Sequence, residues 1–140
     1  MFFRRIKSYW QPKLVLPDPP AGYLSTHFRA AEFACNHCGK LHPSGDMPPK
    51  ELLDILENIR SHFGQPITIN SGYRCLTHNT NVGGAGNSRH MHGDAADIMI
   101  TDIAPSLVYK YADQLVGSRG GVGKYPNFTH IDVRGYKARW

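Results

Sequence analysis

The sequence predicts a small single α+β domain, in which helices flank a mainly antiparallel sheet. Apolar residues recur at helical spacing over about 48–63, which predicts a long amphipathic helix. Strand-like apolar runs follow at 95–100, 120–125 and 128–133, the last two joined by a Pro-Asn turn. A mixed order of helices and strands is typical of α+β domains, and 140 residues suit one domain.

The predicted domain occupies residues 25–140, after an N-terminal arm over 1–24. Ser25 or Thr26 is expected to cap a short helix that ends at Phe33. No apolar run has the length of a signal peptide or a bilayer span, so we expect a cytoplasmic chain that does not insert into membranes. The residues that break regular structure in the arm are Pro12, Pro17, Pro19, Pro20 and Gly22.

The helix expected over 48–63 begins with Pro48 and Pro49, which fit a first turn because its N–H groups need no partner in the helix. Gly64 provides the C-terminal stop. A strand over 66–70 should follow. The apolar face of the helix consists of Leu52, Ile55, Leu56, Ile59 and Phe63.

Residues 71–90 are rich in Gly, Asn, Ser and Thr and are predicted to form a long irregular loop. Loops of this length in compact domains are usually functional. After the strand at 95–100, Thr101 or Asp102 should cap a second helix over about 103–116. The residues expected to point inward from that helix are Leu107, Val108, Tyr111 and Leu115.

His90 and Asp97 are the first candidates for metal ligands. Catalytic zinc takes three protein ligands, from histidine nitrogen and carboxylate oxygen, and leaves one position for water. Asp97 lies within an apolar strand, where a carboxylate is costly unless it is paired or metal-bound. Gly93 allows a sharp turn between the two residues. A simple ion pair between Asp97 and an arginine is the alternative.

His130 and Asp132 alternate along the last predicted strand, so their side chains should share one face. This pattern suits a metal ligand beside a carboxylate that orients it or handles protons, although a solvent-facing polar edge would look the same. Arg74 directly follows a strand and a glycine turn. Its guanidinium could stabilise an oxyanion or bind a substrate carboxylate, or it could pair with a surface acid.

These segments together resemble a known family. The pattern Ser88-x-His90-x-x-Gly93-x-Ala95-x-Asp97, with a later histidine on a strand, resembles the signature of the zinc D-alanyl-D-alanine carboxypeptidase family. That family is grouped with lysostaphin-type peptidases and the hedgehog domain. The resemblance covers about 28–140. Segments that resemble the phage and bacterial branch are Ser-Gly-Tyr-Arg, Asn-Thr-Asn-Val-Gly-Gly and His-Ile-Asp-Val-Arg.

The resemblance implies a small α+β peptidase domain that holds one catalytic zinc ion. Its implied metal ligands are His90, Asp97 and His130. Arg74 matches the arginine that contacts the substrate carbonyl in the family. The residues expected to contact the substrate are Ser88, His92 and Tyr73.

The general base is less clear, because several members of the family carry an acid three residues before the last zinc histidine. Here Asn127 occupies that place and cannot act as a base. Asp132 is the favoured candidate, since strand alternation puts it beside His130. Asp94 is expected to be a solvated loop acid, and His92 to contact the metal surroundings or the substrate.

The resemblance predicts a monomeric enzyme that hydrolyses peptide bonds in bacterial peptidoglycan, as a D-Ala-D-Ala carboxypeptidase or a stem-peptide endopeptidase. A phage or prophage endolysin, released to the host cell envelope, is the expected setting. The alternative is a non-catalytic zinc-containing module that binds the cell wall or belongs to a virion. Spacing does not indicate which peptide bond is cleaved.

Three cysteines, Cys35, Cys38 and Cys75, leave three interpretations open. Cys35 and Cys38 resemble one knuckle of a zinc ribbon, so His37, His42 or Cys75 would have to complete a second, structural metal site. A disulfide that involves Cys75, or three reduced thiols, are the others.

The net charge of +5 favours anionic partners. Its Lys and Arg residues are scattered, which argues against nucleic acid and against a nucleic-acid-binding zinc ribbon built on Cys35 and Cys38.

Overall fold

A five-stranded sheet forms the centre of the fold in the computed structural model, which describes residues 15–44 and 48–140. The strand order is β1-β2-β4-β3-β5, with β3 and β5 parallel and the other neighbours antiparallel. The predicted α+β class with a mainly antiparallel sheet is therefore confirmed. The strands are β1 (Ile67–Ser71), β2 (Ala95–Ile100), β3 (Gly121–Lys124), β4 (Thr129–Asp132) and β5 (Ala138–Arg139).

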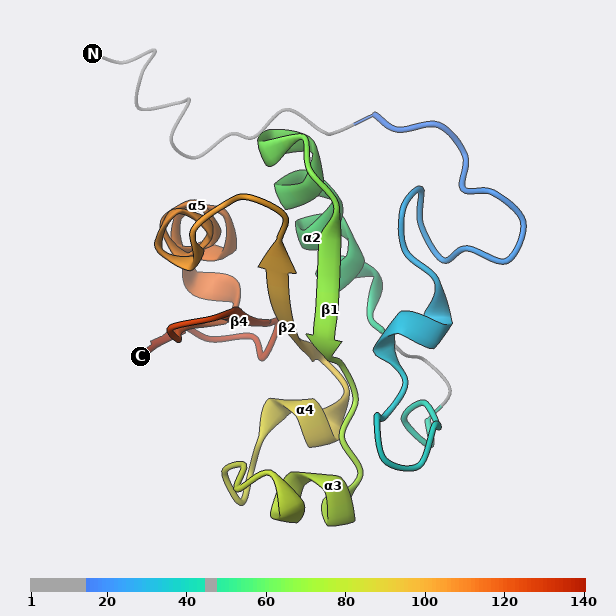
Figure 1. The fold of residues 1–140 in the computed structure, drawn as a ribbon, viewed down its shortest axis with the longest axis vertical. Coiled ribbons are helices and arrows are strands. Elements are labelled where there is room, and N and C mark those ends of the chain that lie inside the picture. Colours follow the sequence, from blue (N-terminus) through green and yellow to red (C-terminus); the bar gives the residue numbers. More distant parts are fainter. Residues whose placement is uncertain (1–14, 45–47) are drawn as a thin grey trace.

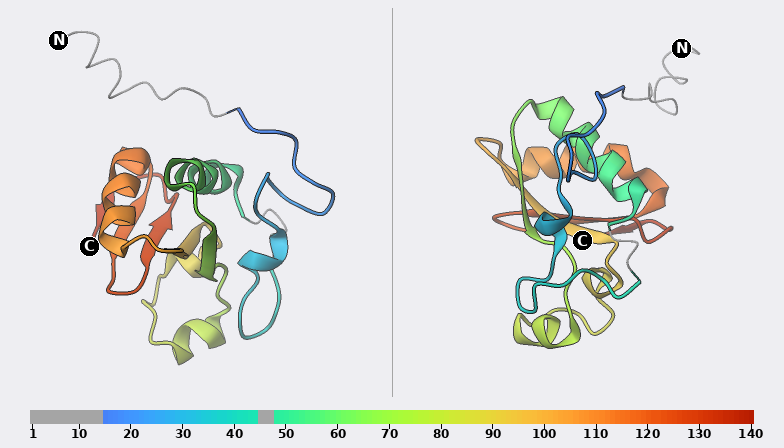
Figure 2. Two further views of the ribbon diagram at one scale, coloured as in Figure 1. Left: turned by 45° about the horizontal axis from the view of Figure 1, so that its top comes forward. Right: turned by 90° about the vertical axis from the view of Figure 1, so that its right-hand side faces the viewer.

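Two long helices, α2 (Lys50–Phe63) and α5 (Pro105–Val116), cover one face of the sheet (Figures 1 and 2). Their apolar side chains join those of the strands in one core. The described helices include none that is both long and apolar enough to cross a membrane. The shorter helices are η1 (Ala30–Phe33), α3 (Leu76–Asn81), α4 (Arg89–His92) and η2 (Gly117–Arg119).

Strand alternation divides the two central strands into an apolar and a polar face. Ile98 of β2 and Ile131 of β4 are buried in the core beneath the helices. Asp97, His130 and Asp132 occupy the alternate positions and therefore point to the opposite face. Helices α3 and α4 lie below the sheet in the view of Figure 1, on the opposite side from α2 and α5, and α4 carries His90.

The first predicted helix cap is wrong. The helix before Phe33 is a single 3-10 turn over Ala30–Phe33. Ser25 does not cap it, because the Ser25 hydroxyl donates to the buried Glu57 carboxylate of α2 at 2.6 Å. His27 also donates its backbone N–H to Glu57, so this segment is tied to α2. Residues 1–14 of the predicted arm lie outside the described residues.

Three further expectations need correction. Helix α5 begins at Pro105 with Ala104 as N-cap, because Asp102 lies in a preceding turn with a positive φ of 62°. Leu107 is exposed, and Val108, Ala112 and Val116 are the buried residues of this helix. The segment 71–90 is not wholly irregular, since it contains α3 and α4. The strand over 95–100 is confirmed. The helix expected over about 48–63 is also present, but it begins at Lys50 with Pro49 as N-cap in an extended conformation, so the two prolines precede the first turn instead of forming it.

Candidate metal centre

The polar cluster on the open face of the sheet is built from α4, β2 and β4. Ser88 caps α4 by accepting the His90 N–H at 3.2 Å, which fixes the histidine in the first turn. Gly93 ends α4 in the left-handed conformation at φ 78°, so that β2 can start two residues later. In the β2–β4 register Asp97 lies directly opposite His130. Three separate stretches of sequence therefore meet at one point.

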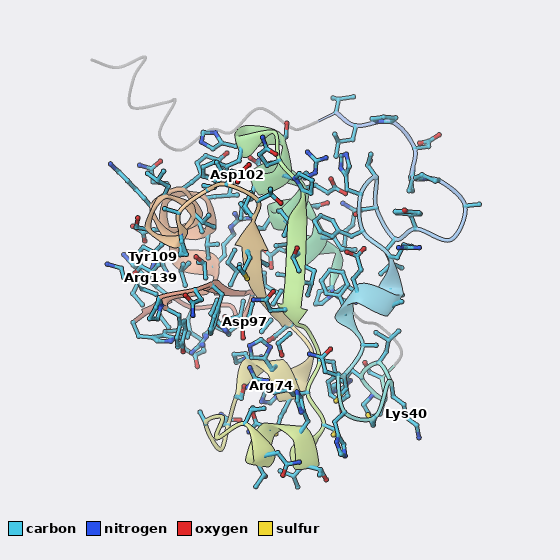
Figure 3. All side chains as sticks on the ribbon, viewed as in Figure 1. Lys40, Arg74, Asp97, Asp102, Tyr109 and Arg139 are labelled. Atoms are coloured by element: carbon cyan, nitrogen blue, oxygen red, sulfur yellow. The ribbon has the colours of Figure 1, made fainter. Side chains whose placement is uncertain are left out.

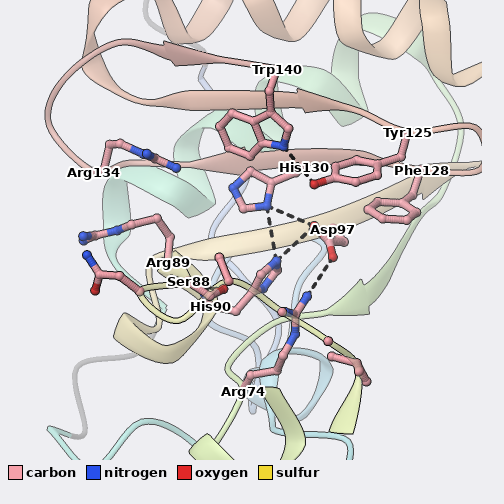
Figure 4. A pocket seen from close by; sticks show the side chains of 15 residues that line it. Arg74, Ser88, Arg89, His90, Asp97, Tyr125, Phe128, His130, Arg134 and Trp140 are labelled. Atoms are coloured by element: carbon pink, nitrogen blue, oxygen red, sulfur yellow. Dashed lines mark hydrogen bonds and ion pairs between the residues drawn. The ribbon is translucent and has the colours of Figure 1, made fainter. Parts of the chain in front are cut away.

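Three ligand atoms form a nearly equilateral triangle at this point. His90 Nε2 lies 3.0 Å from Asp97 Oδ1, and His130 Nδ1 lies 3.1 Å from the same oxygen. The two imidazole nitrogens are 3.2 Å apart (Figure 4). All three side chains are buried. They form a group whose ligand atoms are close enough together to hold one metal ion.

In each imidazole, the hydrogen bond of the ring nitrogen outside the triangle determines whether the nitrogen inside it carries a proton or a lone pair. His90 Nδ1 lies 2.8 Å from the Gly72 carbonyl oxygen, which can only accept, so Nδ1 carries the proton. His130 Nε2 lies 2.7 Å from the Asp132 carboxylate and donates for the same reason. In the neutral imidazoles, the nitrogens that face the triangle therefore present lone pairs toward the Asp97 carboxylate. Three acceptors without a donor repel one another unless a cation lies among them.

The pKa shifts in the cluster indicate that Asp97 stays ionised beside a positive charge, whether a proton or a metal ion. Burial raises the pKa of Asp97, but His130 and His90 outweigh this effect and hold it well below its ordinary value. Burial lowers the pKa of His130, but Asp132 and Asp97 reverse that effect and raise it. The cluster therefore attracts positive charge.

Arg74 holds the second oxygen of the Asp97 carboxylate. Its Nη2 donates to Asp97 Oδ2 at 3.2 Å, and Figure 4 marks this pair with a dashed line. Nε donates to Ser71 Oγ and Nη1 to Asn79 Oδ1, so the guanidinium is fixed on three sides. Arg74 therefore pairs with a buried candidate ligand and not with the surface acid of the alternative interpretation. Its role toward an oxyanion or a substrate carboxylate stays a prediction.

Asp132 has a different position from that expected of a general base. Its side chain has 0 % exposure and lies behind the His130 ring, on the side away from His90 and Asp97. Arg134 binds it through Nε and Nη2, and Gly121 N–H donates to it at 2.9 Å. Burial raises its pKa, but His130 and Arg134 lower it below the ordinary value. A carboxylate so enclosed suits the orientation of His130 better than contact with a water molecule in the open site.

A pocket of about 630 Å³ opens onto the triangle (Figure 4). Ser88 and Arg74 line it, as expected of residues that contact a substrate. Tyr73 and His92 are not among its lining residues. Tyr73 packs edge-on against His42, and His92 is exposed and bonds Asn87 at 3.0 Å.

The other two residues considered as bases also lie elsewhere. Asp94 is not a solvated acid, because Arg89 binds both of its carboxylate oxygens. Asn127 is exposed in the turn between β3 and β4. Among the residues that line the pocket, Asp97 carries the only side-chain carboxylate, and it is the one that faces the two histidines.

An aromatic wall of Tyr125, Phe128 and Trp140, which sequence patterns did not indicate, closes one side of the pocket. The Tyr125 and Phe128 rings stack at 4.4 Å, and Trp140 Nε1 donates to the Tyr125 hydroxyl at 2.8 Å. The Trp140 ring lies 4.9 Å from that of His130. Gly123 makes room for it, since a Cβ there would lie 2.6 Å from the indole. In the sequence, Gly123 was the one residue that could have indicated this aromatic wall.

A second group that could hold a metal ion consists of Cys35, Cys38 and Cys75. The three cysteines are free thiols, and the Sγ atoms of Cys35 and Cys75 lie 3.6 Å apart. Burial raises the pKa of Cys35, but the backbone N–H groups of Cys75, Cys38 and His37 outweigh this and lower it to about 7.

Residues 26–132 match the protein family described as Peptidase M15. The chain is 57 % identical over 44 residues to the zinc D-Ala-D-Ala carboxypeptidase of Streptomyces albus G, a match that covers 31 % of this chain and 17 % of the relative. It is 39 % identical over 91 residues to the peptidoglycan L,D-endopeptidase MepK of Escherichia coli (strain K12), which covers 59 % and 49 %. The chain therefore spans about half or less of the length of these curated relatives.

Proposed function

The chain belongs to the peptidase M15 family, and from this premise we propose that it hydrolyses peptide bonds of bacterial peptidoglycan with one zinc ion held by His90, Asp97 and His130. The family match agrees with the resemblance inferred from the sequence motifs. The names of two relatives specify a zinc D-Ala-D-Ala carboxypeptidase and a peptidoglycan L,D-endopeptidase. Either a terminal or an internal bond of the stem peptide is therefore a candidate substrate.

The triangle of three acceptor atoms is the observation that carries this proposal. Nitrogen and oxygen ligands about 2.0 to 2.1 Å from a tetrahedral zinc ion lie roughly 3.3 Å from one another. The three measured separations, 3.0, 3.1 and 3.2 Å, are close to that value. Two imidazoles and one carboxylate are also a donor set that suits catalytic zinc, with the fourth position left for water. The residues present therefore fit the ion.

A bound zinc ion would supply a water molecule with a pKa of about 7 and would polarise the scissile carbonyl. Asp132 keeps the Nε2 proton of His130 in place, so that Nδ1 offers its lone pair. Arg74 orients Asp97 and presents a guanidinium beside the position where the oxyanion of the attacked carbonyl would form. We therefore assign Asp132 and Arg74 to positioning and charge stabilisation.

The pocket walls suit a peptide that carries a carboxylate. Three arginines line the pocket, Arg74, Arg89 and Arg134, and each is already paired with an aspartate. Their guanidinium groups keep further N–H donors for a substrate carboxylate, such as the end of a stem peptide. The aromatic wall opposite offers an apolar surface for the peptide chain.

Digestion of purified peptidoglycan, followed by mass spectrometry of the released muropeptides, tests the function. The zinc-loaded protein should release peptide fragments, chelator should stop the reaction, and added zinc should restore it. His90→Ala should bind no zinc at this site and release nothing. His62→Ala, which removes an exposed histidine from α2 on the other face of the sheet, should behave as the unchanged protein. Full digestion by His90→Ala would refute the proposal.

A second candidate function is a non-catalytic module that binds the wall or belongs to a virion. One observation favours it: Asp97 has the only side-chain carboxylate among the pocket-lining residues, so no other acidic side chain there is free to take a proton from water. The same digestion separates the two. A module would sediment with purified walls and release no fragment in the presence of zinc.

We propose a phage or prophage endolysin as the biological setting. The net charge of +5 would favour contact with the anionic polymers of a wall. Bacteria that produce the protein internally should lyse when their inner membrane is permeabilised and not before. Intact cells after permeabilisation, with purified walls still digested, would argue against this setting.

A further inference from the structure

The cysteine cluster is not part of the pocket, and it has the features of a second metal site. Its three Sγ atoms lie within 4.8 Å of one another, although Cys75 is far from the other two in sequence. Cys35 is buried, Cys75 half-buried and Cys38 exposed. The loop that ends at Lys40 brings the first two beside α3, whose N-cap is Cys75 (Figures 1 and 3).

Two tight backbone turns present the sulfur atoms. Cys35 and Lys40 are joined by a hydrogen bond from Cys35 N–H to the Lys40 carbonyl at 2.8 Å, and Gly39 N–H donates to the Cys35 carbonyl at 2.8 Å. Gly39 has a φ of 73°, which a residue with a side chain rarely adopts. At the second turn, the His78 N–H donates to Cys75 Sγ and the Cys75 N–H to Cys35 Sγ, both at 3.4 Å. Such N–H donors stabilise thiolates, the form of cysteine that binds metal.

The sulfur separation favours a metal over a disulfide. A disulfide bond is about 2.05 Å long, far shorter than the 3.6 Å between Cys35 and Cys75. Two sulfurs each about 2.3 Å from a tetrahedral zinc ion lie roughly 3.8 Å apart. The observed distance is therefore close to one edge of a zinc tetrahedron.

The fourth ligand is expected from a histidine next to the cluster. His78 follows Cys75, the N-cap of α3, by three residues, and its N–H donates to Cys75 Sγ at 3.4 Å, which ties its backbone to the cluster. Its ring stacks parallel to that of His37 at 6.3 Å, so a second imidazole is also close. His78 is half-buried and His37 is exposed, which favours His78.

We propose that Cys35, Cys38 and Cys75, together with His78, bind one structural zinc ion. The four residues form the pairs Cys-x-x-Cys and Cys-x-x-His, and a closed set of three thiolates and one imidazole suits structural rather than catalytic zinc. The ion would link the loop over 34–40 to the segment 71–79. That segment supplies the Gly72 carbonyl and Arg74 to the histidine cluster, so the second ion would support the first site from outside.

Zinc counting on the full chain tests this inference, with proteins purified from zinc-supplemented medium. We expect two zinc ions per chain, and one each in Cys38→Ser and in His90→Ala. With cobalt in place of zinc, thiolate-to-cobalt charge-transfer absorption should persist in His90→Ala and in the His62→Ala control. It should disappear in Cys38→Ser and weaken or shift in His78→Ala but not in His37→Ala.

The two proposals fail in different ways. If the chain holds one zinc ion that Cys38→Ser loses and His90→Ala keeps, the cysteine site stands and the catalytic site falls. If Cys38→Ser fails to fold, thiol titration of the unchanged protein still tests whether the cysteines bind zinc. Three thiols that become reactive together with zinc release support the site. A Cys35–Cys75 disulfide in the intact mass, or three reactive thiols without zinc, would overturn it.

Discussion

The histidine cluster and the cysteine cluster are both sets of three ligands, but they are held by different parts of the fold. His90, Asp97 and His130 are buried, and two of them lie on central strands that α2 and α5 cover from the other face. The cysteines lie outside the sheet, two of them on a loop and the third at the start of the short helix α3. The first cluster is therefore preformed by the core, whereas the second connects segments that have few core residues of their own.

This difference predicts two different uses of a metal ion. Where the scaffold is preformed, metal binding contributes chemistry, and its loss should cost activity more than stability. Where the ligands lie on loops, much of the binding free energy is folding free energy, and its loss should cost stability. Donor types agree with this division, since two imidazoles and a carboxylate leave a ligand position open and three thiolates with an imidazole do not.

The largest effect should come from Asp97→Asn. It removes the negative charge to which both histidines and Arg74 are directed, so zinc affinity should fall and hydrolysis should drop by about 10³-fold or more. The rate of muropeptide release measures it. The midpoint of thermal unfolding without metal should change little. Asp54→Asn, at an exposed α2 residue, is the control. A large loss of stability with activity retained would reverse the roles assigned to the two clusters.

Cys38→Ser should show the opposite pattern. Loss of a structural ion removes several kcal/mol of stability, so thermal unfolding should move down by about 10 °C or more. Activity per folded molecule should fall only a few-fold, since the exposed Cys38 is not among the pocket-lining residues. Calorimetry with zinc present measures the shift. An unchanged midpoint, together with unchanged zinc content, would contradict the assignment.

The sequence predicted the parts of both sites that depend on short-range patterns. The alternation of His130 and Asp132, and the apolar strand around Asp97, follow from strand geometry. The family resemblance, and not strand geometry, grouped His90 with Asp97 and His130, and the register of β2 and β4 places the last two opposite each other. The long helix α2, which Gly64 caps, could be predicted in the same way. These features depend on residues that are neighbours in one element.

Features that depend on long-range contacts could not be predicted in the same way. Cys75 and Ser88 cap the short helices α3 and α4 through hydrogen bonds within the first turn. Where these helices lie, however, depends on how the rest of the chain packs. Asp132 was expected to act as a base because strand alternation puts it beside His130, but the backbone N–H of Gly121 on the neighbouring strand β3 helps to enclose it, a contact that no local pattern predicts. Trp140 joins the pocket only because β5 pairs with β3.

A smaller effect should follow Asp132→Asn, which tests whether Asp132 orients the metal ligand His130 without binding the metal itself. An amide can donate to His130 Nε2, so the ring proton would move to Nδ1 and oppose metal binding. Zinc affinity and activity should fall together by about 10- to 100-fold. Competition with a chelator of known affinity measures the first. Asp113→Asn on α5, which removes the charge paired with Arg139 and lies outside the pocket lining, should leave zinc affinity unchanged. Unchanged affinity in Asp132→Asn would remove its role in orienting the ligand.

The smallest effect should come from the aromatic wall. Trp140→Phe keeps an aromatic ring but loses the hydrogen bond to the Tyr125 hydroxyl, which is worth about 0.5 to 1.5 kcal/mol. KM for a muropeptide substrate should therefore rise about 2- to 10-fold with little change in kcat, if the wall holds the peptide chain as proposed. Tyr109→Phe, outside the pocket, should change neither constant. A fall in kcat with zinc content reduced would instead mean that the indole, 4.9 Å from His130, holds that ligand in place.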